Sequence, residues 1–389
     1  MLLKSGKLRL KMDNDSAFCI LYFICLIKDF ILYGTTVTEL FETGLLKTVT
    51  MSLHMLVILF GLYIIFVLNQ VTRKELLEFS FLIMNGVLIY IRTRSADFFD
   101  LVFIIFSARY VNLNKILKEI LIVQGTMTAL IIALSYLGVI SNIVDMANRI
   151  MGKRFGIGFT HPNRAGIIAF EIICLLMYCG KRRRLGKYFL SIIILLLIYF
   201  PTKARTAYYL SAAVIAMFFV KEFGKCLSVK TIKIIVKVGI FALFCSVILF
   251  ILYLYQNQEK YYYSTLISRI KMATVYFKSY SVNLFGNDIS SGTWTRLPGT
   301  DYGYYYLDNG LLNYLLSQGI IAFTWFVWNY KKTITKLINH KNWSYLIILI
   351  SYAVYAMVET TPMSCVCNIF LIIFGYSILD RADQFKILK

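Results

Sequence analysis

The sequence predicts an all-α fold, a polytopic transmembrane helical bundle of about twelve spans with a long extracytoplasmic loop between the ninth and tenth. Hydrophobic residues make up 59% of the 389 residues, and charged residues only 16%. Because a soluble protein of this size needs more polar surface than that, the bilayer is the expected solvent. The 28 Tyr and 30 Phe fit aromatic belts at the membrane interfaces.

The apolar runs predict where the spans lie within one integral membrane domain, residues 1–389. A span needs about 20 apolar residues, or fewer where neighbouring helices shield it. The candidates are 16–33, 51–69, 76–91, 97–112, 116–139, 164–180, 187–201, 205–221, 234–255, 308–328, 344–358 and 364–380. An even number of spans places both chain ends on one side of the membrane.

The basic residues predict which side that is. In a soluble protein, the net charge of +21 would suggest nucleic-acid binding. Here the Lys and Arg residues lie mostly in short tracts between apolar runs. Such tracts are typical of cytoplasmic loops, so no nucleic-acid partner is expected. KRRRLGK and NYKKTITK carry most weight, because the rule is strongest for short loops. We therefore expect a multi-pass membrane protein with both termini cytoplasmic.

Cysteine and histidine usage argues against a metal site or a disulfide framework. The eight cysteines lie almost entirely within apolar runs, no C-x-x-C pair occurs, and the chain has three histidines. Buried small side chains explain such cysteines. The basic N-terminal stretch before the first run is interpreted as a cytoplasmic tail, not as a cleaved signal peptide. No cofactor is expected.

The stretch RFGIGFTHPNRAG, residues 154–166, places polar residues directly before an apolar run: Arg154, His161, Asn163 and Arg164. Pro162 suits the first position of a helix, so one interpretation is a helix-start signal with interfacial arginines. The other is an anion site, since a helix N-terminus offers free N–H groups and arginine suits phosphate. Gly156 and Gly158 would let the backbone approach such a ligand closely.

Two further features point to the same predicted face. TKARTA, residues 202–207, opens the eighth span with Lys203 and Arg205, which are either interface anchors or a clamp for a diphosphate. Glu171 follows Arg164 by seven positions, so both lie on roughly one helix face. Glu171 is interpreted either as a buried, hydrogen-bonded carboxyl or as a proton acceptor.

The outer loop 256–307 is too long to be a simple connector, and its aromatic residues argue against disorder. TVYFKSYSV, residues 274–282, predicts a short helix on the membrane surface. DYGYYYLDNGLLNYLLSQGII ends the loop with Asp301, Tyr304, Tyr305, Tyr306, Asp308 and Asn309. Asp308 or Asn309 caps a helix, or the patch faces carbohydrate, with tyrosine rings stacking on sugars and an aspartate taking a proton.

For the other charged residues, the sequence leaves two roles open, structural pairing and function. Arg269, Lys271 and Arg296 in the long loop are solvated or contact an anion. Glu359 lies in a short predicted outer turn, VETTPMS. The charges in and near the first and fourth spans are Lys28, Asp29, Asp97, Asp100 and Arg109.

The three quoted motifs resemble the O-antigen polymerase and O-antigen ligase family, especially polymerases of capsular or exopolysaccharide repeat units. The resemblance covers nearly the whole chain in layout, but only those three stretches in motif. It implies that Arg154 and Arg205 hold a lipid-linked diphosphate. The ligases carry a His-Asn step before a glycine; here Asp308 and Asn309 precede Gly319. The replacement of His by Asp308 favours a polymerase.

The resemblance therefore implies a membrane glycosyltransferase that works without a metal. It would polymerise polyprenyl-diphosphate-linked oligosaccharide repeat units into capsular polysaccharide, exopolysaccharide or O-antigen at the outer face of the bacterial cytoplasmic membrane. A glycan ligase and a flippase of lipid-linked oligosaccharide are the alternatives. Expected partners are the lipid-linked substrate, the bilayer, a chain-length regulator and a flippase. The expected site residues are Asp308, His161 and Glu171 for catalysis, Arg154, Arg164, Lys203 and Arg205 for the diphosphate, and Asn163, Asp301, Tyr304, Tyr305 and Asn309 for the glycan.

Overall fold

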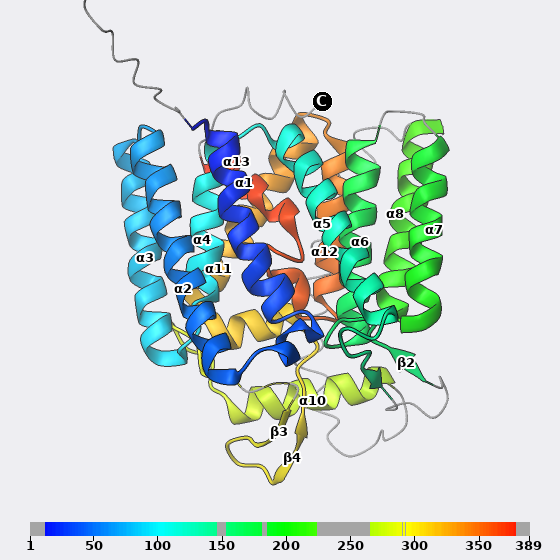
Figure 1. The fold of residues 1–389 in the computed structure, drawn as a ribbon. Coiled ribbons are helices and arrows are strands. Elements are labelled where there is room, and N and C mark those ends of the chain that lie inside the picture. Colours follow the sequence, from blue (N-terminus) through cyan, green and yellow to red (C-terminus); the bar gives the residue numbers. More distant parts are fainter. Residues whose placement is uncertain are drawn as a thin grey trace, which may run out of the picture.

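The computed structural model describes residues 12–145, 153–180, 185–223, 265–289, 291 and 293–378. These residues form a helical bundle with two short two-stranded sheets at one end (Figure 1). The predicted span 234–255 lies outside the described residues. The α-helices are α1 (Asn14–Cys25), α2 (Thr43–Leu62), α3 (Arg73–Thr93), α4 (Asp97–Ser107), α5 (Leu113–Tyr136), α6 (Pro162–Cys179), α7 (Leu185–Thr202), α8 (Arg205–Phe223), α10 (Thr265–Ser279), α11 (Gly310–Asn339), α12 (Trp343–Ala356) and α13 (Ile373–Ile378).

Short helical segments and strands complete the chain. A π-helix, η1 (Leu26–Leu32), extends α1, and a second, η3 (Tyr63–Leu68), extends α2. The 3₁₀ turns are η2 (Thr36–Leu40), η4 (Ala108–Tyr110), η5 (Thr361–Met363) and η6 (Ile369–Ile372). The strands are β1 (Val144–Asp145), β2 (Arg154–Phe155), β3 (Thr293–Arg296) and β4 (Tyr302–Tyr305). Strand β1 pairs antiparallel with β2, and β3 pairs antiparallel with β4.

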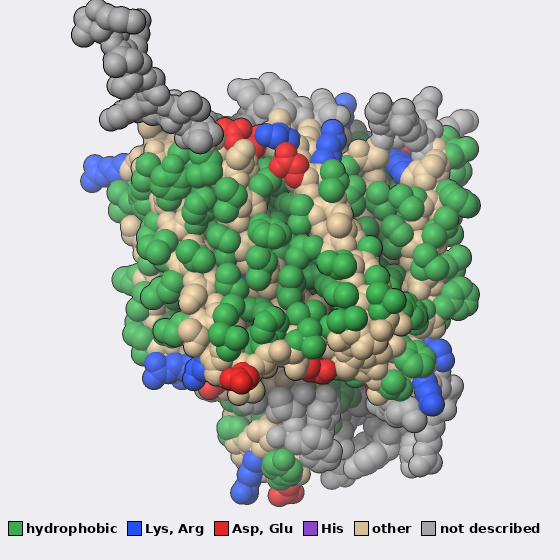
Figure 2. Space-filling view, in the orientation of Figure 1, with side chains coloured by type: hydrophobic (Ala, Val, Ile, Leu, Met, Phe, Trp, Pro, Cys, Tyr) green, Lys and Arg blue, Asp and Glu red, His purple; other side chains and the backbone are tan. Residues whose placement is uncertain are grey.

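Seven helices among the described residues are long and apolar enough to cross a membrane. They are Thr43–Leu68, Arg73–Thr93, Leu113–Tyr136, Pro162–Cys179, Leu185–Thr202, Arg205–Phe223 and Gly310–Asn339. On the face shown in Figure 2, hydrophobic side chains form a broad band, and charged side chains gather at its two edges. The predicted all-α membrane bundle is confirmed in this coarser form, whereas the number of twelve spans is not established.

Two predicted spans differ from continuous helices. The run 97–112 folds as α4 with only 11 residues, followed by the 3₁₀ turn η4. The run 364–380 begins with a non-helical stretch that includes the buried Cys365–Asn368, and turns helical only at η6 and α13. Hydrophobicity alone marked both runs as spans, because a buried segment is apolar whether or not it is helical.

The site lies at one end of the bundle, which we call the hairpin end. It contains α10, the β1–β2 pair and the β3–β4 hairpin, together with the starts of α6, α8 and α11 (Figure 1). Helix α1 begins at the opposite end. The helix predicted within 274–282 is the last part of α10, and it packs into a small core rather than lying free. Ala273 and Tyr276 contribute to that core with Leu297, Leu307, Leu312 and Leu316.

Gly319 breaks α11 where a loop packs against it. Its φ of 83° lies in the left-handed region, and a Cβ there would lie 2.3 Å from the Leu284 carbonyl oxygen. Ile320 N–H donates to the Asn283 carbonyl at 2.9 Å, and Asn287 N–H donates to the Leu316 carbonyl at 2.8 Å. The loop therefore supplies partners for backbone groups freed by the kink.

We expect Gly319→Ala to destabilise the protein by about 2–4 kcal/mol, because the alanine is strained at this φ and meets backbone atoms that cannot retreat. Gly125→Ala is the matched control: its Cβ would meet nothing within 4 Å, so helix propensity alone should act, slightly in favour of alanine. Thermal unfolding of both variants in detergent measures the difference. Equal melting temperatures would show that the kink is not constrained.

Candidate functional site

A chain of polar contacts joins the three sequence motifs at the hairpin end. The pairing of β1 with β2 sets Asp145 opposite Arg154, and their side chains form an ion pair at 3.1 Å. The same guanidinium donates to Asn163 Oδ1 at 2.5 Å and to the Thr202 carbonyl at 3.0 Å. Arg154 therefore connects the loop before α6, the first turn of α6 and the end of α7.

The chain continues from Asn163 to the third motif. Asn163 Nδ2 donates to Glu359 Oε1 at 2.8 Å, and Glu359 pairs with Arg269 of α10 at 3.5 Å. Arg269 Nε lies 3.1 Å from Asp308 Oδ2, and its NH1 donates to the Val358 carbonyl at 2.8 Å. We call Asp145, Arg154, Asn163, Arg269, Asp308 and Glu359 the arginine network.

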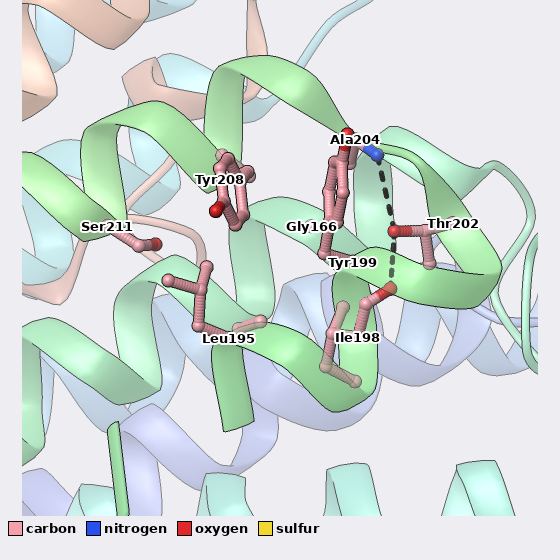
Figure 3. Close-up of a pocket in the computed structure, with 10 residues that line it drawn as sticks. Gly166, Leu195, Ile198, Tyr199, Thr202, Ala204, Tyr208 and Ser211 are labelled. Carbon is pink, nitrogen blue, oxygen red and sulfur yellow. Dashed lines mark hydrogen bonds between the residues drawn. The ribbon is translucent and has the colours of Figure 1, made fainter. Parts of the chain in front are cut away.

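Close packing of small residues brings TKARTA to this site. A Cβ on Gly166 of α6 would lie 2.6 Å from Ala204 Cβ and 3.0 Å from Ala207 Cβ, so the start of α8 packs closely against α6. The Thr202 hydroxyl closes the turn before α8 by donating to the Ile198 carbonyl at 2.6 Å and accepting from Ala204 N–H at 3.3 Å (Figure 3). Figure 3 shows this junction around a small void of about 10 Å³.

This turn positions the remaining basic residues of the second motif. Lys203 adopts a left-handed φ of 49°, between the end of α7 and the start of α8. Arg205 is exposed at the first residue of α8. Burial lowers the pKa of Arg154, and the positive charges of Arg205 and Arg269 lower it further. The structure therefore holds the guanidinium groups of Arg205 and Arg269 within electrostatic reach of Arg154.

Burial raises the pKa of two carboxyl groups of the network: Asp308 at the start of α11 and Glu359 after α12. The pKa of Glu359 is raised to about 7: burial is the largest cause, the Asp308 charge adds to the rise, and Arg269 and Arg154 oppose it. Burial also raises the pKa of Asp308, and Arg269 opposes it. Glu359 thus changes its charge near neutral pH, where a proton acceptor works best.

His161 forms the N-cap of α6. Its Nδ1 accepts from Asn163 N–H at 3.1 Å, so a neutral ring carries its proton on Nε2. Burial lowers the His161 pKa, and the Arg154 charge lowers it further. Capping by His161 orients the backbone of Asn163, whose side chain belongs to the arginine network.

Arg164 points away from the arginine network. Its NH2 donates to the Asp29 carbonyl of η1 at 3.0 Å, and its side chain lines a separate cavity. Consecutive residues of a helix point about 100° apart, so Asn163 and Arg164 face different sides of α6. The residues predicted to bind the diphosphate are therefore separated. Arg154, Lys203 and Arg205 lie on one side of α6, and Arg164 lies on the other.

The two glycines of the first motif serve the protein's own packing instead of a ligand. A Cβ on Gly156 would lie 2.4 Å from the Phe159 carbonyl oxygen. Gly158 has a φ of 87°, a Cβ there would lie 2.9 Å from Ile131, and its carbonyl accepts from Thr36 N–H at 3.0 Å. The expectation of close backbone approach to a ligand is wrong, because protein atoms already occupy that space.

Glu171 lies deep in the bundle, away from the arginine network. Its carboxylate accepts from Gln124 Nε2 at 2.7 Å and from Ile369 N–H at 2.8 Å, and it is fully buried. The second bond satisfies a backbone group at the start of η6, where the last apolar run is not helical. The structure therefore places Glu171 at the break in that run and separates it from His161 and Asp308.

The predicted glycan residues are dispersed. Asn309 is the N-cap of α11 and accepts from Leu312 N–H at 2.8 Å, while Asn163 belongs to the arginine network. Asp301 is exposed at the turn of the β3–β4 hairpin, where its carbonyl accepts from the Tyr305 hydroxyl at 2.9 Å. Tyr304 lies in β4 opposite Trp294. Asp301 precedes Asp308 by seven residues of largely extended chain, roughly 20 Å.

A cavity of about 580 Å³ lies on the Arg164 side of α6. Its lining comes from η1, the junction of α3 and α4, the start of α11, and segments 287–289 and 360–366. Lys28 lies in its wall and pairs with Asp29 at 3.1 Å and also with Asp100. The cavity and the arginine network thus meet at two neighbouring pairs, Asn163 with Arg164 and Glu359 with Thr360.

Sequence reasoning left Glu359 and Arg269 open, although they connect the motifs. A glutamate in a short turn between two apolar runs is a signal that could have identified Glu359, since charges near the membrane are costly. Within the described part of the chain, no group of three His, Cys, Asp or Glu side chains could hold a metal ion. Arg109, the other buried arginine considered, pairs with Glu75 at 3.6 Å.

Comparison of the chain with protein-family models, with curated proteins and with solved structures found no match.

Proposed function

We propose that this protein is a membrane glycosyltransferase that polymerises lipid-diphosphate-linked oligosaccharide repeat units at the outer face of the bacterial cytoplasmic membrane. The observation that carries the proposal is the arginine network, which joins three sequence motifs that together span about 150 residues of the chain. The network combines guanidinium groups with a carboxyl of near-neutral pKa, and it lies beside a cavity large enough for a glycan.

The leaving group of the proposed reaction explains the arginines. The acceptor hydroxyl attacks the anomeric carbon of the donor sugar, the carbon–oxygen bond to the lipid diphosphate breaks, and the diphosphate keeps the electron pair. Arg154, Arg205 and Arg269 lie where they can stabilise that charge, because fixed cationic donors in a low-dielectric site need no reorganisation. Arginine also presents a planar fork that matches phosphate oxygens.

The acceptor needs a group that takes its hydroxyl proton. Glu359 suits this role better than Asp308, because its pKa is about 7 and it lies between Asn163 and Arg269. Asp308 is paired with Arg269 at 3.1 Å, and this pairing opposes the rise that burial causes in the Asp308 pKa. We assign Asp308 to positioning Arg269, and Glu359 to proton transfer.

The proposed topology places the hairpin end outside the cell. A cysteine at Asp301, which is exposed in the hairpin, should react with an impermeant maleimide in intact cells. A cysteine at Asn339, exposed at the opposite end of α11, should react only after permeabilisation. Wild-type protein measures the background from native cysteines. The reverse pattern would place the proposed site in the cytoplasm and contradict the function.

Deletion of the gene tests the activity itself. Cells without the protein should lose long surface polysaccharide and accumulate one repeat unit on the lipid diphosphate, facing outward. Mass spectrometry of extracted lipids identifies the accumulated species. Accumulation of finished polymer on the lipid would indicate a ligase instead, and accumulation of inward-facing repeat units would indicate a flippase. Restoration by the wild-type gene is the control.

A further inference from the structure

The cavity beside the arginine network contains polar groups that have no partner within the described protein. These groups are Asp100 Oδ1, the Tyr314 hydroxyl and Gln318 Oε1. Their residues are only 6, 7 and 5% exposed, and all three line the cavity. Buried polar groups are nearly always hydrogen-bonded, so three unpaired groups around one cavity indicate that a polar occupant completes them.

The charges around the cavity nearly balance, which indicates a neutral occupant. The lining contains four aspartates, against one lysine, two arginines and one histidine. The lysine, Lys28, is already paired with Asp29 and Asp100. An anion would face the four carboxylates, and a cation would face the basic side chains. A neutral molecule with many hydroxyl groups instead finds both donors and acceptors, because Ser, Thr, Asn and Tyr side chains supply the rest of the polar lining.

We infer that the cavity binds a neutral, hydroxyl-rich oligosaccharide segment. Its volume of about 580 Å³ suits a ligand of several rings. The Tyr314 ring, Leu101 and Ile104 give it apolar surface for the faces of sugar rings. Its deepest residues are buried, whereas Tyr33, Arg94 and Asp288 are exposed at its rim.

The position of the cavity relates this site to the chemistry. At the start of α6, Asn163 belongs to the arginine network and its neighbour Arg164 lines the cavity. After α12, Glu359 belongs to the network and its neighbour Thr360 lines the cavity. A glycan in the cavity would therefore approach the carboxyl of Glu359 with its diphosphate or acceptor end. The inference depends on the proposed function only for the identity of the glycan, and it names residues outside the expected glycan set.

Matched substitutions can test the cavity without disturbing the fold. Tyr314→Phe removes an unpaired hydroxyl inside the cavity, and Gln318→Leu removes an unpaired amide oxygen there. Tyr352→Phe removes an equally buried, unpaired tyrosine hydroxyl on α12, away from the cavity. Each of the three should raise the melting temperature of the unliganded protein, because each replaces an unsatisfied polar group with an apolar one.

The probe is the neutral oligosaccharide fraction that mild acid releases from the lipids of the producing cells. Calorimetry on the full-length protein in lipid nanodiscs measures its binding. Wild type and Tyr352→Phe should bind with equal affinity, whereas Tyr314→Phe and Gln318→Leu should each bind about 5–10-fold more weakly. Arg154→Ala should bind this diphosphate-free probe normally.

The outcomes separate this inference from the proposed function. No saturable binding to wild type, or equal binding by the wild type and both cavity variants, would overturn the inference and leave a cavity filled by water. Weakened binding in the cavity variants, together with normal polymer in Arg154→Ala cells, would support the sugar site and contradict the proposed diphosphate clamp.

Discussion

Replacing Arg154 by alanine is expected to slow polymerisation by roughly 10²–10³-fold, so that long polysaccharide disappears and single lipid-linked repeat units accumulate. The expected effect is large because, under the proposed function, Arg154 stabilises the departing diphosphate, and because its side chain also joins Asp145, Asn163 and the end of α7. Lysine at this position should recover only part of the rate, since it keeps the charge without the planar fork. Gel electrophoresis of surface polysaccharide and chain extension in nanodiscs measure both variants.

Arg296→Ala is the matched control, because Arg296 is an exposed arginine at the same end of the bundle and donates only to the Thr300 carbonyl at 3.0 Å among the contacts described. It should leave chain length unchanged. Melting temperatures in detergent separate loss of function from loss of fold in Arg154→Ala. A folded Arg154→Ala protein that makes polymer of normal length would refute the assignment of this side chain to the diphosphate.

Glu359→Gln should lower the rate of glycosyl transfer by roughly 10²–10⁴-fold, because the amide cannot accept the hydroxyl proton. The amide oxygen can still accept from Asn163 Nδ2, so the geometry of the network should persist. Since the Glu359 pKa is about 7 and the active form is deprotonated, the wild-type rate should fall about tenfold per pH unit below neutrality. Initial rates from pH 5 to 9 measure this profile.

The same carboxyl predicts how stability depends on pH. Burial raises the folded pKa of Glu359 above its unfolded value of about 4.5, so the folded state binds the proton more tightly. Stability should therefore decrease as pH rises from about 4.5 to 7, and then remain level. Glu359→Gln should flatten this slope, which provides a readout that is independent of catalysis.

Two comparisons decide whether Glu359 is the base. Glu42→Gln replaces an exposed carboxylate before α2 and should change neither rate nor pH profile. Asp308→Asn should slow transfer less than Glu359→Gln, because it only loosens Arg269. A normal profile in Glu359→Gln together with a lost one in Asp308→Asn would move the base to Asp308.

The fold was largely predictable because hydrophobic periodicity and length dominate helix formation in a chain this apolar. The helix starts at Pro162, Arg205 and Gly310 lie within two residues of the predicted ones. The break before η6 was not predictable, because the backbone group at its end is satisfied by Glu171, nearly 200 residues earlier in the chain. Local sequence carries no trace of that bond.

The site was predictable in part for the same reason. The three motifs were recognisable because they place polar residues at predicted helix starts. The structure brings Arg154, Asn163 and Asp308 into one network. Their partners Arg269 and Glu359 come from distant segments that no pattern links. The cavity could not be inferred at all, because its unpaired groups are defined by what lies around them in space. The role of the glycines was ambiguous, because the sequence is the same whether Gly158 lies close to a ligand or close to Ile131.

Under the proposed function, helix α6 would limit how far the protein can adapt to different repeat units. Its first turn is tied to Glu359 through Asn163, and its middle is tied to η6 through Glu171. Sliding this helix by even a fraction of a turn would break both hydrogen bonds at once, so the axial position of α6 in the bundle is fixed. Tolerance for larger or branched glycans must then come from segments 287–289 and 360–366, and changes there should alter which sugars are accepted without altering the transfer step.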